Sequence, residues 1–218
     1  GDGNDTIYGG QGNAWVDAGE GDDRVTVDGW NNTILGGTGN DIIFAGTGND
    51  TVRWNAAGDT DGFDIIDGEA GGTDTFVLTG SAATETFRIY ARAEAIAAGV
   101  PIQGANTEIV ITRTVGLTTT IIAELDNIEE ITVNTLNTTA NNGNNPNLPD
   151  GGTSNGDTIQ VIGNFNAPFT SLNFSTITID GNAGDDTIDI SSLDSAHRIV
   201  FRSNGGNDTI VGTLRPQD

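Results

Sequence analysis

A nine-residue repeat runs without a gap from Gly1 to Arg53, and it constrains the fold more than any other feature of this chain. Each unit combines glycine-rich positions, a position that is Asp or Asn in five of the six units, and one β-branched apolar residue two places later. Six successive units keep the same register, which chance does not produce. The apolar position is Ile7, Val16, Val25, Ile34, Ile43 and Val52. The acidic position is Asp5, Ala14, Asp23, Asn32, Asp41 and Asp50.

Each unit fits a turn followed by a short strand. Glycine in the turn permits a positive φ, and the β-branched residue suits an inward-facing strand position. Because each turn reverses the chain, two units make one coil, and equivalent turns on one edge stack 18 residues apart. The pattern therefore predicts a solenoid of parallel strands in which each coil contacts only the next.

The chain is strongly acidic, with 31 Asp and Glu against 8 Arg, no Lys and a net charge of −23. With 32 glycines, this composition alone would suit a disordered chain. The repeat instead places many Asp residues at stacked turns, where their charges repel one another. A cation between the turns would remove that repulsion. The hard oxygen donors of Asp and the backbone suit Ca²⁺ first and Mg²⁺ second.

The same composition excludes several classes of function. The absence of Cys excludes a disulfide scaffold, a thiol nucleophile and a Cys-ligated zinc site. With one His, metals that prefer imidazole are also disfavoured. The negative charge argues against nucleic acid and anionic membranes as partners. No apolar run reaches the length of a membrane span.

These residues resemble the RTX family of hemolysin-type calcium-binding repeats, whose motif GGxGxDxUx, with U apolar, matches residues 1–53 in unbroken register. The resemblance implies a parallel β-roll in which the Asp residues of two stacked turns hold one Ca²⁺ and turn carbonyls complete the shell. It also implies an internal fragment of a larger bacterial protein, exported by type I secretion, with several Ca²⁺ ions. The candidate metal-binding residues of this block are Asp5, Asp23, Asp41, Asp50, Gly3, Gly21, Gly39 and Gly48.

The two edges of the expected roll are not equivalent. Full sites are expected between Asp5 and Asp23 and between Asp23 and Asp41, at steps of 18 residues. On the opposite edge Ala14 cannot ligate, and Asn32 offers a neutral oxygen at best, so its sites are expected to be weak or absent. The alternative is that each Asp only forms a local Asx-turn. Three Asp residues at a fixed interval favour the metal.

Degenerate copies of the repeat follow the regular block. They occur at residues 59–67, 68–77, 181–189 and 203–211, and their acids Asp64, Asp74, Asp186 and Asp208 are further calcium candidates. A looser copy at 151–160 carries Asp157. In the last third, apolar positions recur every 11 residues, at Ile177/Ile179, Ile188/Ile190, Ile199/Phe201 and Ile210. This spacing predicts either rungs of a solenoid or an antiparallel sheet.

The sequence predicts an all-β chain with a parallel β-roll or β-solenoid at its N-terminus and further β-rich structure after it. Three regions are expected: the RTX roll at 1–78, a β-rich connecting or inserted region at 79–150, and a β-rich region with degenerate repeats at 151–218. The middle region shows no repeat, and its acids have no assigned role. Its expected elements are strands at 87–90, 108–114, 119–124 and 129–135, a short helix or loop at 91–98, and a turn-rich loop at 136–156.

No catalytic residue and no site for an organic cofactor is predicted. The single His197 lies near Ser195 and Asp194, but no nucleophile elbow is present, and a capping or surface role is favoured. Trp15 and Trp54 lie next to inward positions. They could face solvent as carbohydrate platforms, although such residues more often contribute to packing.

The leading hypothesis is a calcium-binding structural module, not itself an enzyme, that folds on binding Ca²⁺ outside the cell. One alternative is a non-catalytic accessory region of a secreted RTX enzyme, such as a peroxidase, protease, lipase or epimerase. Another is an adhesin or surface-layer module. Carbohydrate binding and self-association stay open. The expected location is extracellular or on the bacterial cell surface.

Overall fold

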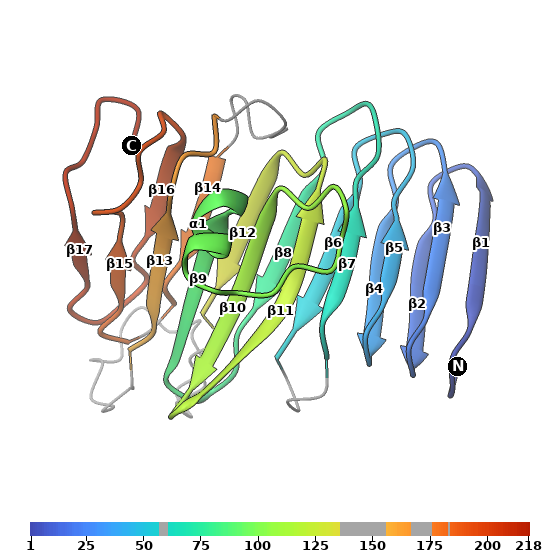
Figure 1. Cartoon of the computed structure of the whole chain (residues 1–218), viewed down its shortest axis with the longest axis horizontal. Helices are drawn as coiled ribbons and strands as arrows, with labels where there is room; N and C mark the ends of the chain where they lie inside the picture. The colour runs from blue at the N-terminus through green and yellow to red at the C-terminus, as the bar shows by residue number, and fades with distance from the viewer. Residues whose placement is uncertain (57–60, 136–155, 167–175, 183) are drawn as a thin grey trace.

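The computed structural model describes residues 1–56, 61–135, 156–166, 176–182 and 184–218. The chain winds as an elongated solenoid in which most successive strands pass from one sheet to the other (Figure 1). One sheet has ten strands and the other has seven. The predicted all-β fold, a parallel roll continued by further β structure, is confirmed.

The strands of each sheet follow the coils along the axis. The ten-stranded sheet has the order β1 (Thr6–Gln11), β3 (Arg24–Asp28), β5 (Ile42–Phe44), β7 (Asp64–Asp67), β11 (Thr118–Asp126), β10 (Ile109–Val115), β9 (Glu85–Ala91), β13 (Thr158–Ile162), β15 (Thr187–Asp189) and β17 (Thr209–Val211). The seven-stranded sheet has the order β16 (Arg198–Arg202), β14 (Thr176–Asp180), β12 (Glu130–Asn134), β8 (Thr75–Thr79), β6 (Thr51–Asn55), β4 (Thr33–Thr38) and β2 (Trp15–Glu20).

The apolar position of the repeat forms the core of the N-terminal coils. Val25 pairs in parallel with both Ile7 and Ile43, at the predicted step of 18 residues. Because strand side chains alternate between faces, this register stacks the β-branched residues in columns between the sheets. Val25, Ile34, Ile43 and Val52 are buried, while Ile7 and Val16 are partly buried against the same core.

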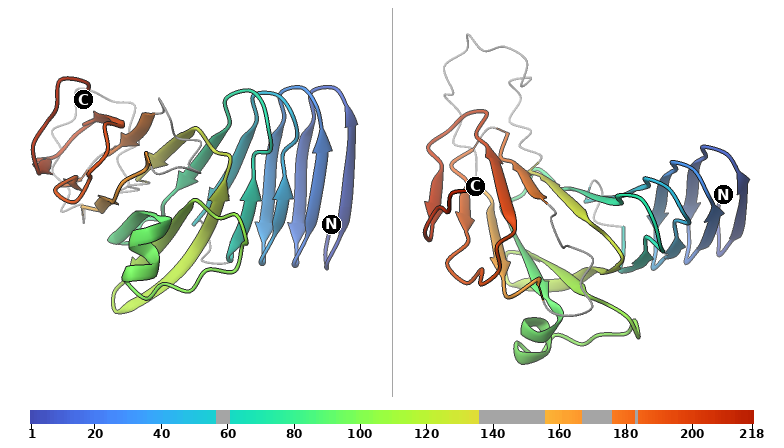
Figure 2. Two further views of the ribbon diagram at one scale, coloured as in Figure 1. Left: turned by 45° about the horizontal axis from the view of Figure 1, so that its top comes forward. Right: turned by 90° about the horizontal axis from the view of Figure 1, so that it is seen from above.

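An antiparallel segment interrupts the ten-stranded sheet. Strand β10 pairs antiparallel with β9 and β11, while β9 and β11 are parallel to their outer neighbours β13 and β7. Helix α1 (Arg92–Ala97) lies between β9 and β10 in the chain. The extra strands widen one sheet only, and the coils on either side do not share one straight axis (Figure 2).

The expected strands of the middle region are all present, with slightly different bounds. Of the two alternatives for residues 91–98, the short helix is the one that forms. The turn-rich loop expected at 136–156 lies outside the described residues, apart from its last residue. No helix among the described residues is long and apolar enough to cross a membrane.

The 11-residue spacing in the last third belongs to a solenoid and not to an antiparallel sheet. Ile177 pairs in parallel with Ile199 in the seven-stranded sheet, and Ile188 pairs in parallel with Ile210 in the other. Each sheet therefore repeats after 22 residues, which is two spacings of 11. The spacing marks half a coil.

Candidate metal centres

Stacked acidic residues form a row along the edge where turns lead into β1, β3, β5 and β7. We call such a row a ladder, and in it the backbone N–H of each residue donates to the side chain of the next. The backbone N–H of Asp5 donates to Oδ1 of Asp23 at 2.7 Å, and that of Asp23 donates to Oδ1 of Asp41 at 2.8 Å. The N–H of Asp41 donates in turn to Oδ1 of Asp64 at 3.0 Å. The structure thus stacks the three Asp residues of the regular block, and Asp64 joins them although its step is 23 residues.

A second ladder lies on the opposite edge, where turns lead into β2, β4, β6, β8 and β12. It starts with the N–H of Ala14, which donates to Oδ1 of Asn32 at 2.9 Å. The N–H of Asn32 donates to Oδ1 of Asp50, and that of Asp50 to Oδ1 of Asp74, both at 2.7 Å. The N–H of Asp74 donates to Oε2 of Glu129 at 2.7 Å.

A third ladder lies on the same edge as the first, beyond β10 and β11. The N–H of Glu85 donates to Oδ1 of Asp157 at 2.8 Å, and that of Asp157 to Oδ1 of Asp186 at 2.7 Å. The N–H of Asp186 donates to Oδ1 of Asp208 at 2.9 Å. Asp186 and Asp208 therefore do have stacked neighbours, although their steps are 29 and 22 residues instead of 18.

Two glutamates that the sequence left without a role belong to these ladders. Glu85 has a glycine, Gly80, five residues before it and the buried Phe87 two residues after it, which is the spacing of the repeat. Glu129 likewise precedes a buried Ile131 by two residues. The signal was present, but it requires reading Glu in place of Asp and omitting most of the turn glycines.

Five of the ladder carboxylates bury one oxygen that has no hydrogen-bond partner. Oδ1 accepts the N–H from the preceding coil, while Oδ2 is buried with no hydrogen bond in Asp23, Asp41, Asp50, Asp186 and Asp208. Among the described residues, the only other carboxyl oxygen in this condition is Oε2 of Glu94, on α1. Buried oxygens of this kind are costly unless a donor or a cation compensates them.

A buried acid outside the ladders shows the contrast. Glu124 is 1% exposed, and its two carboxylate oxygens accept the N–H groups of Gln103 and Gly104 and the hydroxyl of Thr107, at 2.5–2.7 Å. Its charge is thus satisfied by the protein itself. Five ladder acids lack this compensation at Oδ2, and they are distributed over all three ladders.

Burial of these acids changes their protonation. Removal from water raises the pKa of Asp41 and of Asp186 to about 6, and that of Asp74 and of Asp157 to about 7. Neighbouring ladder carboxylates contribute to this increase in pKa, while the backbone N–H bonds oppose it. Without a cation, part of the ladder charge is therefore neutralised by protons near neutral pH.

The predicted glycines bring successive turns into backbone contact. Gly3, Gly21, Gly39 and Gly48 all have positive φ, from 92° to 145°. At Gly21 a Cβ atom would lie 2.6 Å from the carbonyl carbon of Gly3 in the turn below. A side chain would therefore separate the stacked turns, whereas glycine allows their backbones to approach each other.

The donor set at the ladders consists of oxygen atoms. No group of three or more acidic, imidazole or thiol side chains is close enough to hold one ion within the described parts of the chain. A cation at a ladder would therefore take two carboxylates and draw its remaining ligands from turn carbonyls. Such a mixed oxygen set suits Ca²⁺, which accepts six to eight ligands in flexible geometry.

The third ladder begins with an internal ion pair. Nε of Arg113, on β10, donates to Oε1 of Glu85, and Nη2 of Arg113 lies 3.2 Å from Oγ of Ser81. The other oxygen, Oε2, accepts the N–H of Ser81 at 2.5 Å. Both side chains are buried, at 9% and 0% exposure. Glu85 is thus a ladder acid whose charge is already compensated.

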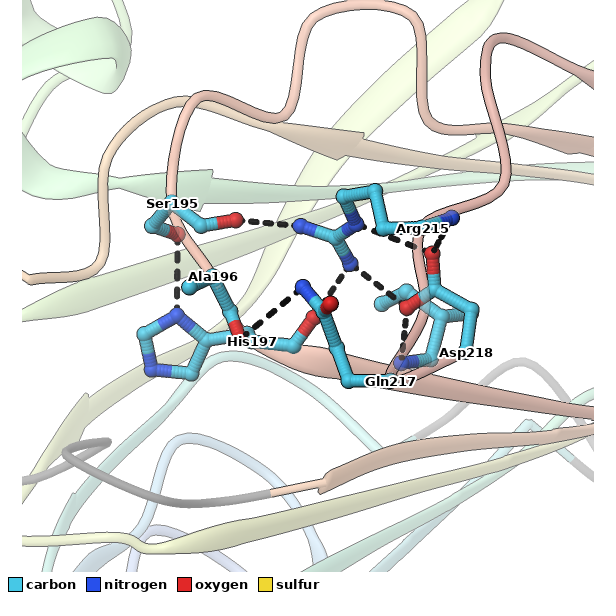
Figure 3. A network of polar contacts seen from close by, with 7 residues as sticks. Ser195, Ala196, His197, Arg215, Gln217 and Asp218 are labelled. Atoms are coloured by element: carbon cyan, nitrogen blue, oxygen red, sulfur yellow. Dashed lines mark hydrogen bonds and ion pairs between the residues drawn. The ribbon is translucent and has the colours of Figure 1, made fainter.

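His197 is part of a structural network near the end of the described chain. It is buried, not on the surface, and its Nδ1 lies 2.8 Å from Oγ of Ser195 (Figure 3). Its ring packs edge-on against Phe165, with 5.7 Å between centroids. Arg215 donates to the carbonyls of Ser195 and His197 and pairs with Asp218. These contacts fix the loop before β16.

The two tryptophans considered as platforms differ. Trp15 is 69% exposed on β2, as expected. The expectation that Trp54 could face solvent is wrong, because it is 2% exposed and its Nε1 donates to the carbonyl of Gly62. Strand β6 continues past Arg53 to Asn55, so Trp54 takes the next inward position after Val52.

A comparison with known protein families finds a calcium-binding repeat in this chain. The RTX calcium-binding nonapeptide repeat matches the chain in four copies, over residues 1–29, 28–53 and 178–189. These segments contain ladder acids of all three ladders. No curated protein and no solved structure matches the chain.

Proposed function

This chain carries RTX calcium-binding nonapeptide repeats, and we propose that it is a structural module whose folding depends on Ca²⁺ held between neighbouring acids of the three ladders. The proposed ligands are the carboxylates of Asp5, Asp23, Asp41, Asp50, Asp64, Asp74, Asp186 and Asp208, with carbonyl oxygens from the turns around Gly3, Gly21, Gly39 and Gly48. Asp157 and Glu129 extend this set by their positions on the ladders.

The observation that carries this proposal is the row of orphaned Oδ2 atoms. Five ladder Asp residues bury an oxygen that has neither a hydrogen-bond donor nor a positive side chain. A Ca²⁺ ion between successive acids would compensate that oxygen and the repulsion between neighbouring carboxylates. The same acids also hold the coils together through Oδ1, so the ion would act on the contacts that define the fold.

Coupling of binding to folding follows from the arrangement of the ladder. The acids of one site come from different coils and meet only when the solenoid is formed. A ligand that binds only the folded state stabilises it by about 2.7 kcal/mol per site at a concentration of 100 times its Kd. Several such sites in one chain make the folded state strongly calcium-dependent.

The proposal extends to the place where the module works. The net charge of −23 is unfavourable to a compact state when no cation is bound. RTX repeat proteins are generally exported by type I secretion, which supports passage as an unfolded chain and folding outside the cell, where calcium is abundant. The proposed role is thus an extracellular structural module without catalytic residues of its own.

Circular dichroism tests the coupled-folding claim. The chain is measured in EDTA, then after stepwise addition of CaCl₂, with MgCl₂ at the same ionic strength as the control. We expect a weakened β spectrum in EDTA at pH 7.5, from a chain that is only partly folded and unfolds at a low midpoint, and a cooperative gain of β signal with Ca²⁺ alone. An unchanged, fully folded β spectrum in EDTA would overturn the proposal.

A further inference from the structure

Asn32 occupies an acidic position of the repeat, but its side chain presents both an oxygen and a nitrogen atom to its neighbours. It is 2% exposed, and its Oδ1 accepts the N–H of Ala14 at 2.9 Å, as a ladder Asp would. Its Nδ2 points the other way, 2.9 Å from Oδ1 of Asp50 and 3.2 Å from the carbonyl oxygens of Trp30 and Ala45. The amide nitrogen thus lies among three oxygens.

The first ladder shows what an Asp does at the equivalent place. Nine residues earlier in the repeat stands Asp23, whose Oδ1 accepts the N–H of Asp5 and whose Oδ2 is buried without a partner. The orphaned oxygen of Asp23 and the amide nitrogen of Asn32 are therefore equivalent atoms. With oxygen at that place the atom has no hydrogen-bond donor, whereas with nitrogen the neighbouring oxygens receive hydrogen bonds.

We propose that the amide group of Asn32 takes the place of Ca²⁺ between Asn32 and Asp50, and thereby determines where Ca²⁺ binds on that edge. The space between two successive ladder residues is called a level here. The inference rests on the proposed calcium-binding function and specifies its stoichiometry. Ions bind from Asp50 onward, while the level between Asn32 and Asp50 carries an amide group in place of an ion.

Two further observations agree with a level built around the amide. Trp30 occupies the turn position that is glycine in the other five units, and it has a positive φ of 75°, which is strained for tryptophan. Its carbonyl oxygen is one of the three that Asn32 contacts. The third ladder has a comparable arrangement, since the nitrogen of Arg113 compensates the ladder acid Glu85.

The charge also separates this level from the others. A pair of carboxylates attracts a divalent cation, whereas one carboxylate and one amide offer half that charge. In addition, the amide hydrogens lie where an ion would have to approach the carbonyl oxygens. Asn32 therefore removes both the charge and the space for Ca²⁺, so no Ca²⁺ binds at this level at any physiological calcium concentration.

The test compares Asn32→Asp with Asn31→Asp. Both variants add one negative charge at neighbouring positions. Asn31 is exposed, and its Oδ1 accepts the N–H of Asn49, a bond that Asp can keep. Isothermal titration calorimetry with CaCl₂ at pH 7.5 gives the number of ions, and thermal unfolding in EDTA gives the stability of the metal-free state.

We expect Asn32→Asp to bind one Ca²⁺ more than the wild type and to unfold in EDTA at a midpoint lower by roughly 5 °C or more, because a buried oxygen loses its compensation. Asn31→Asp should match the wild type in ion number and in EDTA midpoint. If Asn32→Asp binds the same number of ions as Asn31→Asp while the wild type binds calcium, the inference is overturned and the proposed function stands.

A wild type that binds no Ca²⁺ at all would instead overturn the proposed function. In that case the unfolding midpoints of the two variants in EDTA test the role of the Asn32 amide without any calcium measurement. An equal midpoint for the two variants overturns the inference, and a lower midpoint for Asn32→Asp alone supports the role of the amide as the compensating group.

Discussion

The backbone N–H of Asp23 donates to Oδ1 of Asp41, 2.8 Å away and 18 residues further along the chain. Such bonds connect each ladder acid to both neighbouring coils. Its own N–H donates to the acid of the following coil, and its Oδ1 accepts the N–H from the preceding coil. The second oxygen of both side chains is buried and free of protein partners. The residues that hold the solenoid together are therefore the ones that need a cation.

Replacing one of these acids by its amide tests this relationship. In Asp23→Asn the acceptor Oδ1 remains and the amide hydrogens replace the missing cation. We expect fewer bound Ca²⁺ ions by calorimetry, together with a higher unfolding midpoint in EDTA than in the wild type. Asp22→Asn is the matched control, because Asp22 is exposed and its Oδ1 accepts the backbone N–H and the side-chain Nδ2 of Asn40, which an amide oxygen can also accept. Equal effects of the two substitutions would contradict the account.

The stability of the calcium-free protein should fall as pH rises. Burial raises the pKa of Asp41 and Asp186 to about 6 and of Asp74 and Asp157 to about 7 in the folded state, above the ordinary value near 3.9. The folded state therefore holds more protons, and its advantage is complete below about pH 4 and lost through pH 6–7.

Thermal unfolding in EDTA from pH 4 to pH 8 checks this sign. The midpoint should decline over this range, and the increase produced by added Ca²⁺ should grow, since calcium and protons compete for the same oxygens. The lowered pKa of Asp189 and of Asp218 acts in the opposite direction, but both lie outside the ladders. A midpoint in EDTA that rises from pH 5 to pH 8 would contradict the expectation.

Close stacking of the turns predicts a strong effect at one glycine. In Gly21→Ala the new Cβ meets the backbone of Gly3 at 2.6 Å, and the residue has a φ of 119°. We expect a loss of about 2–4 kcal/mol in the free energy of unfolding with calcium present, and weaker Ca²⁺ binding. Gly10→Ala is the control, because no atom lies within 4 Å of its added Cβ. Chemical denaturation of both variants gives the comparison.

The ion pair at the start of the third ladder predicts a stability effect that calcium does not remove. Arg113→Met leaves Glu85 buried and uncompensated, and we expect a loss of about 3–5 kcal/mol in the free energy of unfolding. Arg88→Met, on the neighbouring strand, removes one hydrogen bond to Thr114 and should cost about 1 kcal/mol. Urea unfolding in saturating Ca²⁺ measures both, and similar losses would refute the role of the pair.

The regular block was predictable because its register has no gap. With a fixed step of 18 residues, the stacking of Asp5, Asp23 and Asp41 follows from counting alone. Asn32 shows the limit of counting. From the sequence we expected at best a neutral oxygen ligand at this position. Which end of the amide points toward the next coil depends on the N–H of Ala14 and the surrounding carbonyls.

The later ladders could not be predicted by spacing. The partner of Glu85 is Asp157, 72 residues away, because β10, β11 and β12 intervene in the chain between stacked neighbours. The burial of Trp54 depends on how far β6 continues beyond the repeat, which is decided by its pairing with Leu78 on β8. Both features are set by contacts between distant segments.

A crystal structure of the calcium-loaded protein, with anomalous scattering used to locate the ions, tests the central claim most directly. The account predicts ions between Asp5 and Asp23 and between Asp23 and Asp41, each bound by carboxylate oxygens of its two acids and by turn carbonyls, and none between Asn32 and Asp50. Ordered Ca²⁺ only at exposed surface acids, with these ladder oxygens still without a cation, would contradict it.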